Sequence, residues 1–154
     1  METPLTEIYV DADACPVKDE IVRVAERHGL TVHMVSNSGM RSSNPLLVRN
    51  IMVAEGPDAA DDWIAERCGG GDVVVTADIP LASRCVANRA RVIGPTGKAF
   101  TPDNMGAVLA TRDLMTHLRE TGEVTGGGRP FAKQDRSRFL QALETAIQAA
   151  KRET

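Results

Sequence analysis

Short runs of apolar residues alternate along the chain with segments whose apolar residues recur at helical spacing. The apolar runs predict buried strands at about residues 7–11, 30–35, within 46–54, 72–76 and 91–93. The segments with helical spacing predict helices at about residues 16–28, 58–68, 80–88, 101–119 and 134–151. Short apolar strands that alternate with helices are typical of a parallel sheet covered on both faces. The pattern therefore predicts an α/β fold, a three-layer sandwich with a mostly parallel central sheet.

Proline and glycine mark the expected ends of these elements. Pro16 suits the first turn of the first helix, and Gly29 suits its C-cap. Thr101, followed by a proline, predicts the N-cap of the fourth helix. Glycines at 122 and 126–128 predict a flexible linker over about residues 122–130. Because no internal repeat or second domain is visible, we expect residues 1–154 to form a single domain.

The composition indicates the cellular compartment and the redox state of the cysteines. No apolar run is long enough to cross a membrane, and the first residues lack the basic and apolar regions of a signal peptide. The cysteines are too few and too scattered for a disulfide framework or a closed zinc site; they are Cys15, Cys68 and Cys85. We therefore expect a cytoplasmic protein with reduced thiols and no membrane partner.

Charge and aromatic content limit how the chain can bind nucleic acid. The net charge is −3 and only 3% of the residues are aromatic. Proteins that hold nucleic acid by broad phosphate neutralisation are usually basic, and single-strand-binding platforms stack bases on aromatic side chains. Any contact of this chain with nucleic acid is therefore expected to be local.

Acidic residues follow the two most apolar predicted strands. In an open parallel sheet, ligands bind outside the carboxyl ends of the strands. The acids at these two strand ends are Asp11, Asp13 and Asp78. The second predicted helix opens with three more acids at i, i+3 and i+4, which share one helix face: Asp58, Asp61 and Asp62. If this helix begins beside the two strands, four or five carboxylates converge.

Converging carboxylates repel one another, and a divalent cation relieves that repulsion. A site made only of carboxylate oxygens suits Mg²⁺ or Mn²⁺, which activate water and stabilise the charge of phosphodiester cleavage. Two of the acids also have purely structural explanations: Asp58 would favour the helix dipole, and Asp13 would cap the first helix. The expected metal ligands are Asp11, Asp13, Asp58, Asp61 and Asp78.

Several motifs resemble a known family over nearly the whole chain. The segments IYVDADACPVK, GPDAADDWI and GDVVVTADIPLA, with the later TRDLM and DRSRF, are similar to the YaiI/YqxD family of bacterial proteins. The first strand, the acidic helix and the T-x-D segment in turn resemble PIN-like and NYN nuclease domains, whose acids hold Mg²⁺ or Mn²⁺ for RNA cleavage. This resemblance implies a PIN-like fold, with Asp11, Asp61 and Asp78 as catalytic metal ligands. It also implies that the Thr76 hydroxyl orients the site.

The first functional hypothesis is therefore a metal-dependent nuclease that acts on RNA phosphodiesters. Basic residues in loops and later helices are candidates to contact the phosphates: Arg41, Arg84, Arg112, Arg129, Lys133 and Arg136. The basic segment 129–138 follows the glycine run, so it would either close over a substrate or tether the last helix.

Two other functions remain open. The apolar strand that ends in Asp11 and Asp13 resembles the D-x-D start of haloacid-dehalogenase phosphatases, in which Asp11 would be the nucleophile and Asp13 the acid/base. The downstream G-D-x-x-x-D pattern of those enzymes is missing after Asp78. The third possibility is a module that binds nucleic acid or metal without catalysis.

Overall fold

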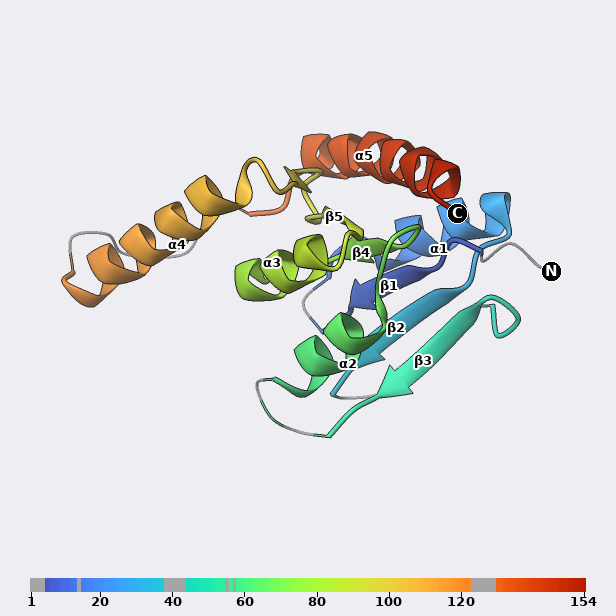
Figure 1. Cartoon of the computed structure of the whole chain (residues 1–154), viewed down its shortest axis with the longest axis horizontal. Helices are drawn as coiled ribbons and strands as arrows, with labels where there is room; N and C mark the ends of the chain where they lie inside the picture. Colours follow the sequence, from blue (N-terminus) through green and yellow to red (C-terminus); the bar gives the residue numbers. More distant parts are fainter. Residues whose placement is uncertain (1–4, 14, 38–43, 55, 57, 123–129) are drawn as a thin grey trace.

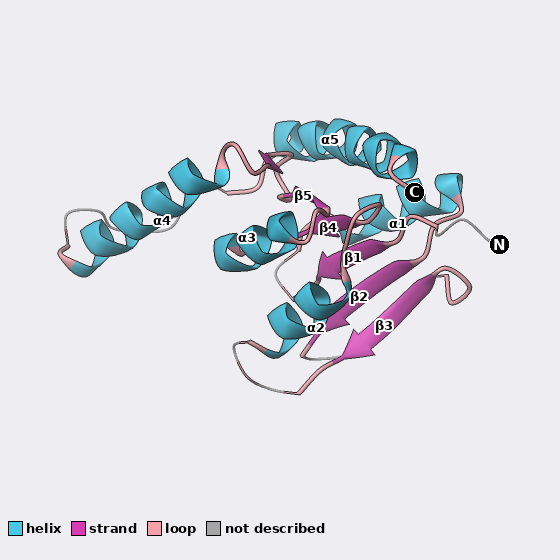
Figure 2. Cartoon of the chain, in the orientation of Figure 1, coloured by secondary structure: helices cyan, strands magenta, loops and turns pink. Residues whose placement is uncertain are grey.

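Strands and helices alternate around one sheet in the computed structural model, which describes residues 5–13, 15–37, 44–54, 56, 58–122 and 130–154 (Figures 1 and 2). The elements are β1 (Ile8–Asp11), α1 (Lys18–His28), β2 (Val32–Ser36), β3 (Val48–Met52), α2 (Ala59–Arg67), β4 (Val73–Val75), α3 (Ile79–Ala87), β5 (Arg91–Ile93), β6 (Ala99–Phe100), α4 (Met105–Glu120) and α5 (Lys133–Arg152). The predicted α/β class is confirmed.

The strand order is β3-β2-β1-β4-β5-β6, and every neighbouring pair is parallel except β5 with β6. The chain first builds the sheet from β1 toward β3 and then returns to place β4 on the other side of β1. The order of the strands therefore reverses between β1 and β4. In open parallel sheets this reversal is where ligands bind, outside the carboxyl ends of the strands.

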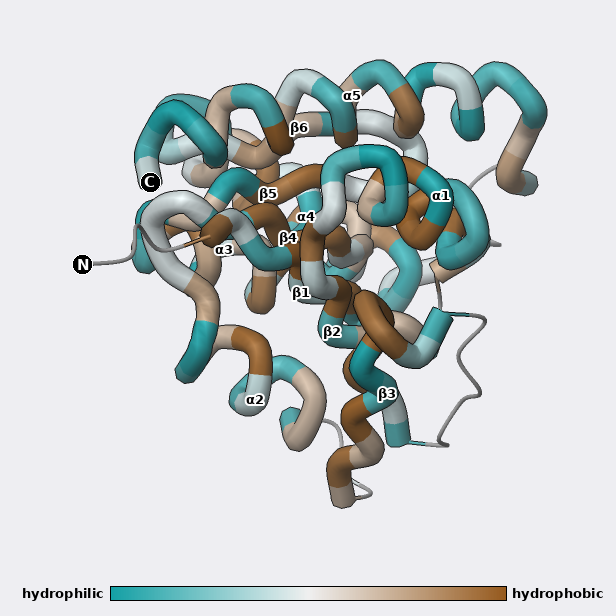
Figure 3. Tube along the Cα trace, turned by 90° about the vertical axis from the view of Figure 1, so that its right-hand side faces the viewer, coloured by the Kyte–Doolittle hydropathy of each residue, from teal (hydrophilic) through white to brown (hydrophobic). Residues whose placement is uncertain are grey.

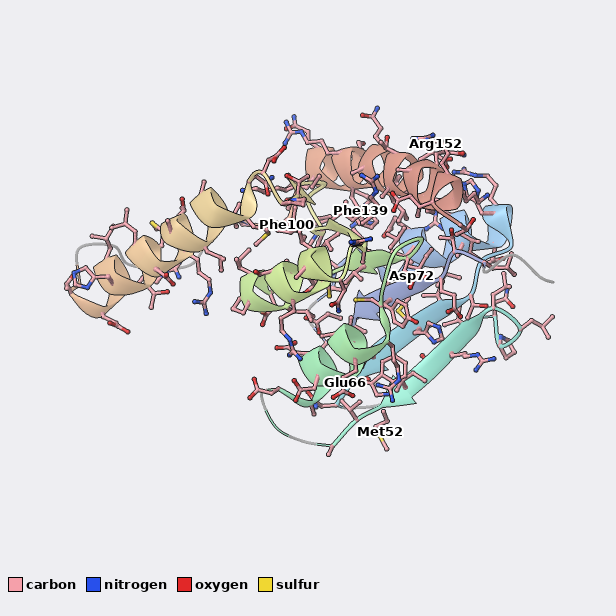
Figure 4. The ribbon with its side chains drawn as sticks, viewed as in Figure 1. Met52, Glu66, Asp72, Phe100, Phe139 and Arg152 are labelled. Carbon is pink, nitrogen blue, oxygen red and sulfur yellow. The ribbon has the colours of Figure 1, made fainter. Side chains whose placement is uncertain are left out.

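Helices cover both faces of the sheet because successive residues of each strand face opposite sides. Ile8 and Val10 belong to the core that packs against α1 and α5, whereas Tyr9 belongs to the core that packs against α2, α3 and the start of α4. In Figure 3 the hydrophobic strands lie between α5 and α2. Phe139 is a residue of α5, labelled in Figure 4, and it is fully buried in the core that contains Ile8 and Val10. Among the described residues, none of the helices is both long and apolar enough to cross a membrane.

Two helix starts and one strand differ most from the sequence prediction. The first helix begins at Lys18 rather than Pro16, because residues 16 and 17 belong to the turn that leaves β1. The fourth helix begins at Met105, because Thr101 and Asn104 close a turn by exchanging backbone-to-side-chain hydrogen bonds of 2.9 and 3.2 Å. The strand β6 was not predicted. The predicted linker begins with Gly122, which follows α4 in a turn, and most of it (123–129) lies outside the described residues.

Helix α4 projects away from the rest of the fold (Figure 1). Of its residues only Met105 and Val108 are buried, and both lie in its first turns. Leu114, farther along the helix, is 56% exposed. The apolar residues in the outer turns of this helix therefore do not join the core.

A cluster of charges fastens α1 to α5. The Glu144 carboxylate accepts hydrogen bonds from Arg27 (2.7 Å) and interacts with His28 (2.9 Å), both at the end of α1. Gln148, one turn farther along α5, donates to the same carboxylate at 2.9 Å. These interactions with His28, Gln148 and Arg27 lower the pKa of Glu144 to about 2 from its ordinary 4.5.

We expect Glu144→Gln to lower the free energy of unfolding at pH 7 by about 1 kcal/mol, because the site is partly exposed. A lowered folded-state pKa stabilises the fold above the unfolded pKa, and this stability is lost as the pH falls through the folded value. The difference between wild type and variant should therefore close between pH 4.5 and 2. Urea unfolding across that range tests this. The control is Glu26→Gln, on an exposed position of α1, and an equal loss in both variants would contradict the prediction.

Candidate metal centre

The candidate site begins where β1 and β4 end side by side. The parallel register pairs Val10 with Val75, so the residues that follow, Asp11 and Thr76, are neighbours at the carboxyl edge. The Thr76 hydroxyl donates a hydrogen bond of 3.0 Å to Oδ2 of Asp11. Thr76 is 1% exposed, so this hydrogen bond is shielded from water. The register of two adjacent strands thus fixes the orientation of the first carboxylate.

The same hydroxyl connects Asp11 to a second acid. The backbone N–H of Asp78 donates to Oγ1 of Thr76 at 3.0 Å. Oδ1 of Asp78 in turn accepts from the N–H of Leu81 at 2.9 Å, so Asp78 is the N-cap of α3. Because the Thr76 hydrogen is given to Asp11, its oxygen is free to accept from Asp78. One buried hydroxyl therefore orders both strand ends.

Asp61 faces these acids from the first turn of α2. Burial first, and then the charges of Asp78, Asp11 and Asp58, raise the pKa of Asp61 to about 6. Burial also raises the pKa of Asp11, against the lowering effect of the Thr76 hydrogen bond, and Asp78 and Asp13 raise it further. The charges of neighbouring acids therefore act on both Asp11 and Asp61, which indicates that these two carboxylates lie near other acids at this edge.

The remaining predicted acids have different surroundings. Oδ2 of Asp13 accepts from the N–H of Asn37 at 2.9 Å, so Asp13 does not cap α1. Asp58 is the exposed N-cap residue of α2 and makes no side-chain capping hydrogen bond. Asp62 pairs with Arg84 at 2.8 Å.

No three His, Cys, Asp or Glu side chains among the described residues form a ready-made set of direct metal ligands. The chemistry of the donors nevertheless fits a hydrated Mg²⁺ or Mn²⁺, which keeps several waters and binds through one or two carboxylates. Oδ1 of Asp11 and Oδ2 of Asp78 accept no hydrogen bond from the described residues. A cation would also remove the repulsion between acids that, after burial, raises the pKa of Asp61.

The predicted phosphate-contacting residues are spread over the molecule. Arg84 pairs with Asp62, Arg136 lies 2.8 Å from the buried Glu20, and Arg112 lies on the exposed part of α4. Lys133 is exposed as the first residue of α5. Arg41 and Arg129 lie outside the described residues.

The sequence reasoning missed Lys18. It is the first residue of α1, and its Nζ donates to the carbonyl oxygen of Ala12 at 3.0 Å, next to Asp11. This places an ammonium group at the edge that carries the acids. Its position just after Pro16, at the expected start of the helix that leaves the acidic strand end, is the signal that could have identified it.

We expect Thr76→Val to lower the free energy of unfolding by about 2 kcal/mol, because two partly buried groups, the Asp11 carboxylate and the Asp78 N–H, lose their hydrogen-bond partner. The pKa of Asp11 should rise further, since the hydrogen bond from Thr76 holds it down. Urea unfolding measures the first effect and a carboxyl NMR titration the second. Thr76→Ser keeps the hydroxyl and is the control. If the valine and serine variants unfold at the same urea concentration, the hydroxyl does not have this role.

Comparison with known proteins gives a consistent family. The model described as "Uncharacterized BCR, YaiI/YqxD family" matches residues 9–149. A UPF0178 protein of Parvibaculum lavamentivorans is 62% identical over 148 residues, covering 96% of this chain and 97% of the relative. A UPF0178 protein of Rhodospirillum rubrum is 58% identical, and the alignment covers 95% of this chain and 98% of the relative. A UPF0178 protein of Agrobacterium fabrum is 57% identical, and the alignment covers 95% of both chains. No solved structure matches the chain.

Proposed function

We propose that this chain, which belongs to the YaiI/YqxD family, is a metal-dependent nuclease that cleaves RNA phosphodiesters at the carboxyl edge of its sheet. The observation that carries the proposal is the buried Thr76 hydroxyl, which orders Asp11 and Asp78 beside the electrostatically coupled Asp61. We include in the proposal that the fold is PIN-like, because acids follow β1 and β4 and open α2.

The acids divide into three principal ligands and two supporting ones. Mg²⁺ or Mn²⁺ would be held by Asp11, Asp61 and Asp78, in part through the waters that the ion keeps, and would supply an activated water and a positive charge at the scissile phosphate. Thr76 keeps Asp11 oriented and favours its ionised form. Asp13 and Asp58, both exposed near the same edge, would position water or a second ion.

Substrate binding at this edge requires positive potential in an acidic protein. Helices α1, α2, α3 and α5 begin at the carboxyl edge, and helix N-termini favour anions. Lys18 adds a full charge next to the acidic strand end. We further propose that Arg84, Lys133 and Arg136 contact the RNA backbone beside the site, together with Arg41, Arg112 and Arg129.

The phosphatase alternative is less well supported. It requires Asp13 to move a proton at the substrate, and Oδ2 of Asp13 already accepts from the N–H of Asn37. The downstream acidic pair of those enzymes is also missing from the sequence.

The test is an incubation of the purified protein with single-stranded and structured RNA, with Mn²⁺, with Mg²⁺ or with EDTA. We expect cleavage only when a divalent ion is present, and no hydrolysis of p-nitrophenyl phosphate. Hydrolysis of the phosphomonoester alone would favour the phosphatase. RNA binding without cleavage across the whole panel would favour a non-catalytic module and overturn the proposal.

A further inference from the structure

A pocket of about 910 Å³ lies between α5 and the strands β5 and β6 at the edge of the sheet. None of the predicted acids lines it. Its volume falls within the range of small-molecule sites, about 300–1,000 Å³. The pocket is therefore a second candidate site, separate from the candidate metal centre and independent of the proposed nuclease function.

Contacts between α5 and the strands hold the two ends of the pocket, and the side chains of α5 between these contacts are mostly small. At one end the turn between β5 and β6 touches α5 closely, since a Cβ on Gly97 would lie 2.8 Å from the carbonyl carbon of Arg138. At the other end Arg91 of β5 forms an ion pair with Glu153. Between these contacts, apart from Gln141, α5 presents small side chains to the pocket: Ala142, Thr145, Ala146 and Ala149. They leave the space unfilled.

Charge is distributed unevenly in this pocket. Arg89, Arg91, Lys98 and Arg138 line it, against the carboxylate of Glu153 alone. Glu153 neutralises Arg91, so the end near that pair keeps only the charge of Arg89. Lys98 and Arg138 lie at the opposite end, beside Gly97. Lys98 is exposed and its ammonium has no partner within the described part of the chain, and Arg138 has only a 3.6 Å contact with Asp135.

The walls between the two ends are apolar. Ile93 and Phe100 line the strand side, and Ala146 lines the helix side; all three are buried residues (Phe100 is labelled in Figure 4). An added peptide strand is disfavoured at this sheet edge, because the carbonyl of Ala99 already accepts a hydrogen bond of 2.9 Å from Asn104. The space suits a small molecule rather than a strand.

We propose that this pocket binds a small organic anion with an apolar body. The anionic group pairs with Lys98 and Arg138, and the apolar body lies between the strands and α5. The net charge of −3 for the whole chain makes this local excess of cations a specific feature of the pocket.

The test uses decanoate and decyltrimethylammonium, which share a ten-carbon chain and differ in the sign of the head group. Isothermal titration calorimetry should give saturable one-to-one binding of decanoate and at least about tenfold weaker binding of the cation. Thr145→Trp, at an exposed position that lines the pocket, should weaken decanoate binding about tenfold by filling the space. Gln148→Trp, on α5 but outside the pocket, is the matched control and should bind normally.

Another variant tests the role of the Lys98 charge without filling the pocket. Lys98→Gln should weaken decanoate binding about fivefold and reduce its sensitivity to salt, because the head group loses one cation. Asp11→Asn, at the other site, should leave decanoate binding unchanged. The proposal is overturned if decanoate does not bind saturably, if the two amphiphiles bind equally, or if Thr145→Trp and Lys98→Gln both bind like wild type.

Discussion

Asp11→Asn is expected to reduce divalent-ion-dependent RNA cleavage by at least about a hundredfold, because it removes a carboxylate from the site that holds the ion. Wild-type protein should gain about 3 kcal/mol of stability when Mn²⁺ is present at a hundred times its dissociation constant. For a domain of this size that gain corresponds to a rise of about 6–12 °C in Tm. The variant should lose this rise together with the activity.

The same variant has an opposite effect when no metal is present. The pKa of Asp61 is raised to about 6, in part by the charge of Asp11, so the ionised acids destabilise the metal-free fold at pH 7. Removing one charge should therefore make the metal-free variant more stable than metal-free wild type above pH 6. Below that pH Asp61 becomes protonated and the difference should shrink.

The control is Asp113→Asn, an exposed acid on α4 that contacts only Arg112, at 3.6 Å, among the described residues. It changes the net charge equally and should keep both cleavage and the Mn²⁺ effect. Thermal unfolding with and without Mn²⁺ and a gel-based cleavage assay provide the two readouts. A Mn²⁺-dependent rise in Tm that survives in Asp11→Asn would place the ion elsewhere.

Gly97→Ala is expected to lower the free energy of unfolding by about 3 kcal/mol. Gly97 has a φ of +94°, and its added methyl group would meet the backbone carbon and oxygen of Arg138 at 2.8 Å. Backbone atoms of a helix cannot rotate away, so the turn or α5 must shift. Urea unfolding measures this loss.

Gly29→Ala separates the two contributions to the loss in Gly97→Ala, which are the cost of a positive φ and the clash of the added methyl group with Arg138. Gly29 also has a positive φ, +68°, but no atom lies within 4 Å of the Cβ that alanine would add. This variant should therefore lose only about 1 kcal/mol, the cost of the left-handed conformation. Equal losses in the two variants would mean that the close contact with α5 contributes nothing.

The parts of the fold predicted from sequence are those with a strong local signal. Val73, Val74 and Val75 form an apolar run that reads as a buried strand, and it pairs centrally as β4. Gly29 marked the end of α1, which it caps in the left-handed conformation. The strand β6 has only two residues, so it carries no periodicity, although the turn that joins it to β5 is closed locally by backbone hydrogen bonds of Gly94 with Gly97 and Lys98.

The candidate site was predictable to the extent that topology alone brings residues together. Asp11 and Asp78 follow strands, and adjacent parallel strands place such residues at one edge. The N-capping role of Asp78 and the bond from Lys18 to Ala12 depend on backbone geometry that spacing does not encode. Likewise, the pairing of Arg84 with Asp62 depends on how α2 and α3 lie against each other.

The projecting helix α4 makes the stability of the molecule uneven. Its residues beyond Leu109 add no side chain to the core, so little free energy opposes their local opening. Their backbone amides should exchange hydrogen for deuterium far faster than those of α5, whose residues Phe139, Leu143 and Ile147 are fully buried. The outer turns of α4 can therefore unwind and re-form while the sheet and both sites stay intact.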